Sequence, residues 1–131
     1  MIFRFDPTRR IIAVIATLSG PQGVSEVELA LDTGASRTLL SPKVLTVVGC
    51  PIPTDAESLA VTTGSRREIM PKVVLPELAA LGHAVRNFPV LAHQLPASTS
   101  VHGLLGLDFF AGCRLELDFR AGTILLEPPH D

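Results

Sequence analysis

Short apolar runs separated by glycine and proline recur along the whole chain. Residues 3–5, 11–18 and 85–92 form such runs, and their β-branched and aromatic side chains predict strands. Residues 27–31 alternate between apolar and mostly polar positions, which predicts a strand with one apolar face. A Gly-Pro-Gln-Gly turn over residues 20–23 separates two of these segments. The pattern predicts a mainly β fold.

Two short helices are predicted to interrupt the strands. The first covers residues 42–48, with Ser41 as its N-cap, proline in its first position and Gly49 at its end. A second, brief helix begins with Asp108 as its cap and ends by Gly112. Both are too short to change the fold class, which stays mainly β with one or two short helices.

Two hairpins are also predicted. Residues 57–75 contain two β-like arms whose tip lies near Gly64, and residues 114–127 contain two more around a glycine-containing turn. Residues 96–100 are predicted to form a loop. Residues 75–81 fit either a strand or a helical turn, and the sequence leaves both open.

Size and charge exclude several classes of partner. The chain has 131 residues, of which 47% are hydrophobic, and this fits one domain with one core. Its 11 Lys and Arg against 13 Asp and Glu give a formal net charge of −2 without a basic run, which argues against nucleic acid. No segment reaches the roughly 18 apolar residues of a membrane-spanning helix. We expect neither a nucleic-acid nor a membrane partner.

The N-terminal region allows two interpretations. Arg9 and Arg10 precede the apolar run 11–18, which ends in small residues and so resembles a secretory signal. Charged residues interrupt the approach to this run, however, and its β-branched residues end at a Gly-Pro turn, which favours a strand. We therefore expect a cytoplasmic protein.

Metal and thiol signals are weak. The four histidines have no metal-ligand spacing, and His102 stands out only because it precedes a glycine motif. Cys50 and Cys113 lie in no metal or redox motif, so we expect reduced, mostly buried thiols, although the sequence leaves a single disulfide open. Serine-hydrolase and phosphate-loop motifs are missing. We expect no metal and no cofactor.

Asp32 has the most unusual surroundings of any charged residue in the chain. It ends a buried apolar strand and is followed by Thr33 and Gly34. A charge there is costly unless it receives hydrogen bonds. Thr33 offers a hydroxyl, and Gly34 permits a tight turn whose backbone N–H groups can point back at the carboxylate. The segment predicts a carboxylate fixed in place, and an ordinary turn that closes the strand is the alternative.

A second motif, Gly103-Leu104-Leu105-Gly106, follows downstream. By itself it fits a buried strand with glycines at its ends. The order of segments along the chain is more specific than this motif alone. An Asp-Thr-Gly turn follows an apolar strand, a hairpin with a glycine tip comes next, and an apolar-apolar-Gly segment comes last. In this order the chain resembles the retropepsin-like, single-domain aspartic proteases, most closely the bacterial members, over residues 11–127.

The resemblance implies a fold and a set of site residues. The expected fold is a closed retropepsin-like β-barrel with a flap hairpin and a short helix near the C-terminus, and residues 1–131 would form a single domain. Asp32 would be the catalytic aspartate, held by Thr33 and Gly34. The residues expected to contact substrate, from the active-site loop, the flap and the second motif, are Ala35, Ser36, Thr62, Thr63, Gly64 and Leu105.

The chain departs from the retroviral pattern at two positions. Retroviral members carry an aspartate two residues after the glycine of the first motif and an arginine directly after the second motif. Here these positions are Ser36 and Leu107, so the ion pair formed by the two family residues is missing from them. Retroviral-style dimerisation and recognition of the substrate backbone therefore do not carry over directly.

Aspartic protease chemistry needs two carboxylates side by side. Two like charges so close cannot both ionise cheaply, so the pair shares a proton, and the ionised member can activate water. The chain has a single Asp-Thr-Gly motif. A homodimer with Asp32 from each chain beside a two-fold axis would complete the site.

Three hypotheses follow, in decreasing order of preference. The first is an aspartic endopeptidase, active as a homodimer on peptide or protein substrates. The second is a protease-like β domain of little or no activity that binds a peptide or mediates dimerisation, and the departures at Ser36 and Leu107 support it. The third is an unrelated β-barrel with a coincidental motif.

Overall fold

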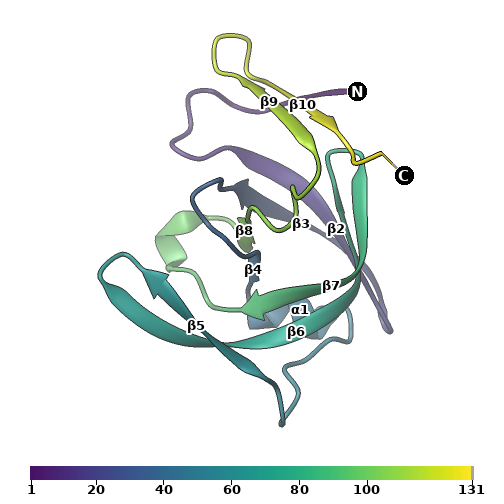
Figure 1. Ribbon diagram of the computed structural model, residues 1–131, viewed down its shortest axis with the longest axis vertical. Coiled ribbons are helices and arrows are strands. Elements are labelled where there is room, and N and C mark those ends of the chain that lie inside the picture. The colour runs from purple at the N-terminus through teal and green to yellow at the C-terminus, as the bar shows by residue number, and fades with distance from the viewer. Residues whose placement is uncertain (131) are drawn as a thin grey trace.

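The computed structural model describes residues 1–130, and most of the regular structure in them is β (Figure 1). The mainly β prediction is confirmed. The strands are β1 Ile2–Arg4, β2 Ala13–Gly20, β3 Gly23–Leu31, β4 Leu39–Leu40, β5 Ser58–Thr63, β6 Arg66–Ala80, β7 His83–Ala92, β8 Gly103–Leu105, β9 Arg114–Asp118 and β10 Thr123–Glu127.

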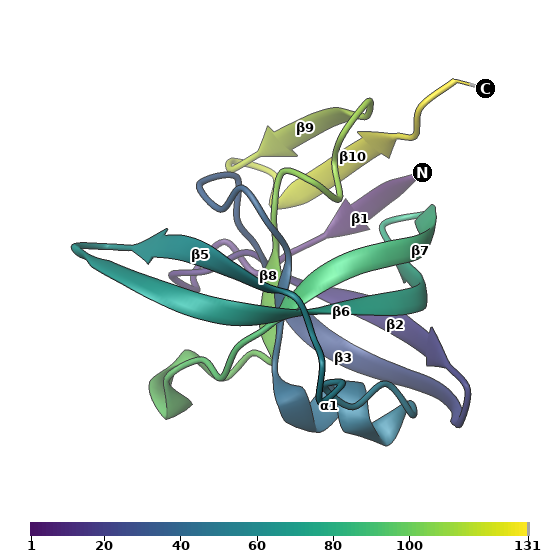
Figure 2. The same ribbon diagram turned by 60° about the horizontal axis from the view of Figure 1, so that its bottom comes forward.

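The larger sheet closes into a barrel. Its strand order is β2-β3-β8-β4-β7-β6-β5, and β2 pairs with β6 as well, which closes the ring and leaves β5 outside it. β6 makes this geometry feasible because its 15 residues span about 50 Å. Its second half pairs with β2 from Glu77 to Ala80, whereas its first half pairs with β5 and extends beyond the barrel (Figure 2). The expected closed barrel is confirmed, and the β5–β6 hairpin extends from it.

Alternation along the strands fills the interior of the barrel. Val14, Ala16 and Leu18 of β2 are buried, whereas the residues between them are less so, and the pattern repeats in β3 at Val27 and Leu29. Such alternation places one face of each strand in the core and the other toward solvent. The core needs no metal or disulfide, since a chain of this size buries enough apolar surface.

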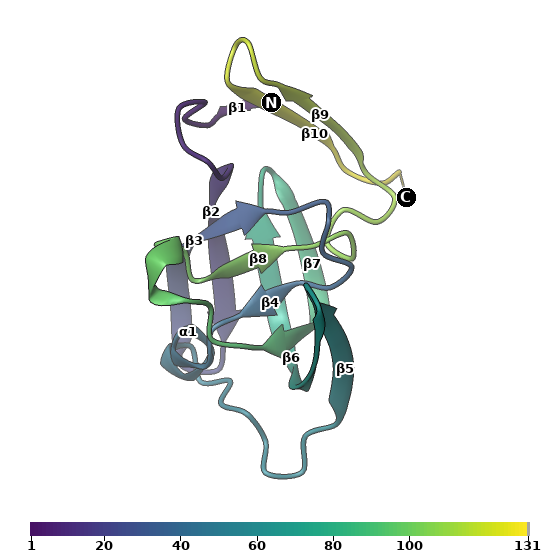
Figure 3. The same cartoon turned by 90° about the vertical axis from the view of Figure 1, so that its left-hand side faces the viewer.

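A second sheet of three strands, β1-β10-β9, lies at one end of the barrel (Figure 3). β1 pairs antiparallel with β10, so that Phe3 lies opposite Ile124. Ile124 and Leu126 belong to the same buried cluster as the barrel core, together with Phe5. The N-terminal strand therefore completes a sheet with the C-terminal hairpin of its own chain.

Two short helical segments are present in residues 1–130, α1 Pro42–Val47 and the 3-10 turn η1 Ala97–Thr99. α1 confirms the first predicted helix, although the hydroxyl of Ser41 at the N-cap makes no capping hydrogen bond. η1 lies within the segment predicted to be a loop. Neither segment, nor any other part of the described chain, is a helix long and apolar enough to cross a membrane.

The helix predicted to begin at Asp108 is wrong, as is the short C-terminal helix that the resemblance implied. Residues 107–112 form consecutive turns, in which Phe109 N–H and Cys113 N–H donate to the carbonyls of Gly106 and Phe110. The reason is that the Asp108 carboxylate binds the distant residue Thr38 as well as its neighbour Phe109, so it does not serve as a simple helix cap. The ambiguous segment 75–81 is extended through Ala80 as part of β6.

Candidate active site

The turn after β3 fixes the carboxylate of Asp32. Asp32 N–H donates to the carbonyl of Leu105 at 2.9 Å, which ties the start of the turn to β8. Gly34 N–H donates to Asp32 Oδ1 at 2.9 Å, and Ala35 N–H donates to the Asp32 carbonyl at 3.2 Å. The carboxylate is thus oriented by the backbone of its own turn, as the sequence suggested, and it stays half-buried rather than sealed in the core.

A second set of hydrogen bonds holds the far end of this loop. The buried Thr38 N–H donates to Asp108 Oδ2 at 3.0 Å, and the Thr38 hydroxyl donates to Asp108 Oδ1 at 2.8 Å. Gly106 N–H in turn donates to the Thr38 hydroxyl at 3.1 Å. Because each of these polar groups has a partner, the loop of residues 32–38 is locked to the segment that follows β8.

The glycines of the second motif permit this close approach. A Cβ on Gly106 would lie 2.6 Å from the carbonyl carbon and oxygen of Arg37 and 2.8 Å from the oxygen of Ala35. A Cβ on Gly103 would overlap the Leu39 carbonyl. Both obstacles are backbone atoms, which cannot swing aside as a flexible side chain can. The two glycines are therefore needed to bring β8 against β4 and the Asp32 loop.

A cavity of about 230 Å³ lies above this loop, beneath the β5–β6 hairpin. It brings together most of the site residues predicted from sequence: Asp32, Gly34, Ala35, Ser36, Thr62 and Thr63. It also has lining residues that sequence reasoning missed: Arg37, Leu39, Val61 and Leu104. Half of the lining residues thus come from the loop after β3, and the rest come from β5 of the hairpin, from β4 and from β8.

Three predicted residues lie elsewhere. Thr33 is exposed beside Asp32 and does not line the cavity, and Gly64 is exposed at the hairpin tip with φ of 61°. Leu105 is completely buried in the core, because alternation along β8 turns its side chain inward. Its neighbour Leu104 faces the cavity instead, so the apolar contact expected from Leu105 falls to Leu104.

The β5–β6 hairpin, expected from the sequence to be the flap, is held at its base and has few contacts at its tip. The Lys72 ammonium donates to Glu57 Oε2 at 2.7 Å, and Lys72 N–H donates to the Glu57 carbonyl at 2.7 Å. The Lys72 ammonium lowers the pKa of Glu57, first by its hydrogen bond and then by its charge. Nearer the tip, the Thr63 hydroxyl donates to Glu68 Oε2 at 3.3 Å. Within the described residues, nothing lies within 4 Å of a Cβ built on Gly64.

The charged pair missing from Ser36 and Leu107 is present one residue further along in each motif. Arg37 Nε lies 3.7 Å from Asp108 Oδ2. The order of charges is reversed relative to the retroviral pattern, since the first motif carries the cation and the second the anion. The signal was available in the sequence, because Arg37 and Asp108 directly follow the two uncharged positions.

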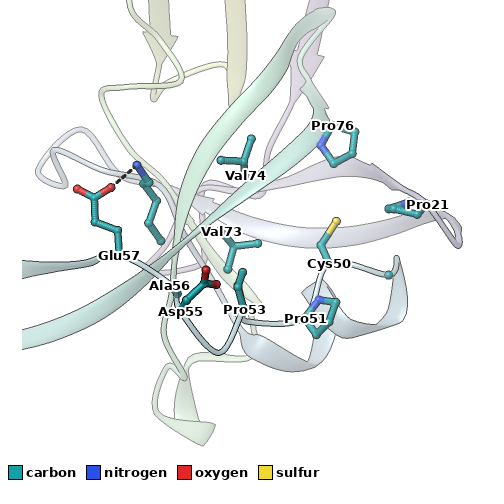
Figure 4. A pocket seen from close by; sticks show the side chains of 12 residues that line it. Pro21, Cys50, Pro51, Pro53, Asp55, Ala56, Glu57, Val73, Val74 and Pro76 are labelled. Carbon is teal, nitrogen blue, oxygen red and sulfur yellow. Dashed lines mark hydrogen bonds and ion pairs between the residues drawn. The ribbon is translucent and has the colours of Figure 1, made fainter.

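Another cavity, of about 480 Å³, lies around Cys50 and the proline-rich segment that follows α1 (Figure 4). Its wall includes Val73 and Val74 of β6, and the Glu57–Lys72 ion pair lies at its edge. Burial raises the pKa of the Cys50 thiol, which disfavours the reactive thiolate. Both cysteines are free thiols, and no group of three or more metal-ligating side chains occurs in residues 1–130. This cavity therefore offers less support for a catalytic or metal site than the cavity at Asp32.

Comparisons with known proteins agree with this fold. The family model described as "Aspartyl protease" matches residues 14–109. Among solved structures, a retropepsin-like aspartic protease from Rickettsia conorii aligns with a TM-score of 0.70 and 16% identity, over 96% of this chain and 88% of that chain. The retroviral protease-like domain of Ddi1 from Leishmania major aligns with a TM-score of 0.55 and 14% identity, over 95% and 99% of the two chains. No curated protein matches the chain.

Proposed function

Because the chain belongs to the aspartyl protease family, we propose that it is an aspartic endopeptidase that hydrolyses peptide bonds as a homodimer. The observation that supports this most directly is the position of Asp32. Its carboxylate is oriented by Gly34 N–H at the edge of a cavity, and a hairpin covers that cavity from above. We also propose that residues 1–131 form one protease domain.

The proposed reaction uses one Asp32 from each chain. One carboxylate is ionised and the other is protonated, because two like charges a few ångströms apart cannot both ionise cheaply. The ionised carboxylate takes a proton from water, the water oxygen attacks the carbonyl carbon of the scissile amide, and the protonated carboxyl gives its proton to the carbonyl oxygen. Transfer of a proton to the amide nitrogen then releases the two peptide products. The pair has macroscopic pKa values that belong to neither residue alone.

The surroundings of the other described aspartates support the use of a second Asp32. Asp108 is occupied by Thr38 and Arg37, and Asp118 Oδ1 accepts hydrogen bonds from Arg120 N–H and Ala121 N–H in the last hairpin. Asp6 accepts from Thr8, Asp55 lines the cavity around Cys50, and Asp32 is the one aspartate among the described residues that lines the cavity beneath the hairpin. An isolated chain would therefore have half of the catalytic pair, and a two-fold axis beside the exposed Thr33 would supply the other half.

We infer that the substrate is an extended peptide held between the active-site loop and the flap. Leu39, Val61 and Leu104 give the cavity an apolar wall, which suits apolar side chains next to the scissile bond. Opening of the β5–β6 hairpin would admit the peptide, since its tip is the least supported part of the wall.

Substitution of Asp32 tests the chemistry. Asp32→Asn should lower kcat/KM on a diverse peptide pool by about a thousandfold or more, since the amide can neither accept nor donate the catalytic proton. Asp118→Asn is the matched control, because Asp118 lies in the last hairpin, and it should cleave like the unmodified protein. Equal cleavage by the Asp32→Asn protein would refute the proposal, and absence of cleavage by a folded unmodified protein would favour a binding module.

Mixed dimers test the need for two chains. When equal amounts of unmodified and Asp32→Asn protein are mixed and allowed to exchange, only about one quarter of the dimers should hold two aspartates. The cleavage rate should then fall to about half of the rate before exchange. An unchanged rate in a mixture that demonstrably exchanges subunits would mean that one chain suffices.

A further inference from the structure

The cavity at Asp32 continues in two directions along the underside of the flap. Toward the start of β5 it adjoins a cavity of about 440 Å³, with which it shares Ser36, Arg37, Val61 and Thr62. Toward the segment after β7 it adjoins a cavity of about 610 Å³, with which it shares Leu39, Thr63 and Leu104. We call these the Arg37 arm and the Glu68 arm of the cleft, after the charged residue in each.

The Arg37 arm has one cation in an otherwise uncharged wall. Apart from Arg37 and the hydroxyls of Ser36 and Thr62, its lining consists of Leu59, Ala60, Val61 and Leu91. Apolar walls strengthen the field of a charge, because water screens it less there. The Arg37 side chain is 35% exposed, so a ligand can reach it without unfolding the loop.

The guanidinium of Arg37 retains free hydrogen-bond donors. Its recorded contact is the ion pair of Nε with Asp108 Oδ2 at 3.7 Å, which is too long for a hydrogen bond. Asp108 already accepts from Thr38 N–H, from the Thr38 hydroxyl and from Phe109 N–H. In the described part of the chain Arg37 donates no hydrogen bond, although its planar group has five N–H donors suited to a carboxylate.

Glu57 is a second carboxylate that feels the charge of Arg37. The charge of Arg37 helps to lower the pKa of Glu57, although Lys72 has the larger effects. Glu57 is already neutralised by Lys72 at 2.7 Å. It therefore does not occupy the donors of Arg37, and it lies outside the residues that line the Arg37 arm.

The Glu68 arm has the opposite character. Glu68 Oε2 accepts a hydrogen bond from Thr63 and lies 3.6 Å from His93 Nε2. A carboxylate placed in this arm would face the charge of Glu68, whereas in the Arg37 arm it would face a cation. Within one chain the two arms therefore differ in charge, and the two-fold axis of the proposed homodimer would repeat each arm on the other side of the bond to be cleaved.

We propose that Arg37 is a specificity-determining residue that binds an aspartate or glutamate side chain of the substrate, so that the cleft selects extended peptides with an acidic residue at one fixed distance from the bond to be cleaved. The proposal rests on the proposed function in that it takes the occupant of the cleft to be a peptide. It extends that function by assigning a substrate class. A bidentate pair between guanidinium and carboxylate would supply the selectivity.

A scan of matched peptides tests this. Glutamate is moved one position at a time through an otherwise uncharged decapeptide, and each peptide is paired with its glutamine counterpart. At two positions, one on each side of the cleaved bond because each chain of the proposed homodimer supplies an Arg37, the glutamate peptide should be cleaved with a kcat/KM about tenfold higher than its counterpart. Binding of the same pairs to the Asp32→Asn protein gives the ratio of Kd values without any cleavage.

Variants of Arg37 test whether this residue causes the preference for glutamate over glutamine. Arg37→Gln should bring the glutamate-to-glutamine ratio close to one, and Arg37→Lys should keep part of it because the charge remains. Arg86→Gln is the matched control, since Arg86 is 84% exposed on the outside of the barrel and pairs with Glu77, and it should leave the ratio unchanged. Thermal unfolding of each variant confirms that it is folded.

The outcomes separate this proposal from the proposed function. A ratio near one at every position in the unmodified protein, or a preference that survives Arg37→Gln, overturns the role of Arg37, whether or not the protein cleaves. If the protein cleaves nothing but its Asp32→Asn form binds the glutamate peptide about tenfold more tightly through Arg37, the endopeptidase fails and the recognition stands.

Discussion

The floor and the roof of the cavity at Asp32 are built in opposite ways. The floor, residues 32–38, is tied to β8 and the following turn by hydrogen bonds from Asp32 N–H to Leu105 and from Gly106 N–H to Thr38, and by both oxygens of Asp108. The roof is the β5–β6 hairpin, in which residues 58–63 of β5 pair with residues 66–71 of β6. The carboxylate of Asp32 thus lies on the side with many hydrogen bonds, and the proposed flap lies on the side with few.

The glycines on the two sides show the same contrast. A side chain on Gly106 would meet backbone atoms at 2.6 Å, whereas one on Gly64 would meet nothing within 4 Å among the described residues. Gly106 is needed because two backbones pass close to each other, and Gly64 is needed because its φ of 61° belongs to a tight turn. The same substitution should therefore act through different causes at the two positions.

Gly106→Ala should have the largest effect of the changes considered. The new Cβ must displace the backbone of Arg37 and Ala35, and overpacking of this kind costs about 3 kcal/mol or more when backbone has to move. Urea unfolding should show this loss of stability, and any folded fraction should have lost activity, because the Asp32 turn shifts. If the Gly106→Ala protein unfolds like the unmodified protein, the floor is more adaptable than its contacts suggest.

Asp108→Ala should cause the next largest loss of stability. It removes the acceptor of the buried Thr38 N–H, and leaving a buried donor without a partner costs about 1–3 kcal/mol. Asp118→Ala is the matched change on an exposed hairpin, where water can replace the carboxylate, and it should cost about 1 kcal/mol or less. Chemical denaturation of both variants checks the order, and equal losses would remove the distinction between a structural aspartate in the floor and one in a surface turn.

These carboxylates also show what the sequence could and could not predict. The Asp32 turn was predictable because the backbone N–H groups that close it belong to Gly34 and Ala35, within one motif. The role of Asp108 was not, because its partner Thr38 is 70 residues away and only the folded chain brings them together. The sequence showed an aspartate before two aromatic residues and a glycine, which favours a helix cap by local rules.

The strands were predicted more accurately than the side-chain directions in the short strand β8. Alternation over residues 27–31 predicted the buried face of β3, because Val27, Leu29 and Leu31 recur at every second position. In β8 two leucines occur side by side, and alternation cannot tell which one faces inward. The pairing of β8 with β3 and β4 decides which leucine faces inward. This pairing places Leu105 in the core and Leu104 at the cavity.

Gly64→Ala tests the roof. The open surroundings remove any steric clash, so the cost is that of holding a non-glycine residue at positive φ, about 1 kcal/mol. Because the change lies at the tip of the flap, it should affect KM for peptides more than thermal stability. Thermal unfolding and steady-state kinetics measure both quantities, and a loss of stability as large as that of Gly106→Ala would contradict the view of a weakly supported roof.

The base of the roof should respond to pH, with the smallest effect. Lys72 lowers the pKa of Glu57 below its ordinary value of 4.5, first through the hydrogen bond and then through its charge. Because the pKa in the folded protein lies below that in the unfolded chain, the pair stabilises the fold above the unfolded pKa, and this contribution is lost as the pH falls through the folded pKa. The Tm of the unmodified protein should therefore exceed that of Lys72→Met slightly at about pH 7, and the difference should vanish once the pH lies well below the lowered pKa of Glu57. Added salt should shrink the difference near neutral pH, since solvent screens an exposed pair. A difference that persists at low pH would come from the packing of the Lys72 stem, and the flap would then be anchored by apolar contact rather than by charge.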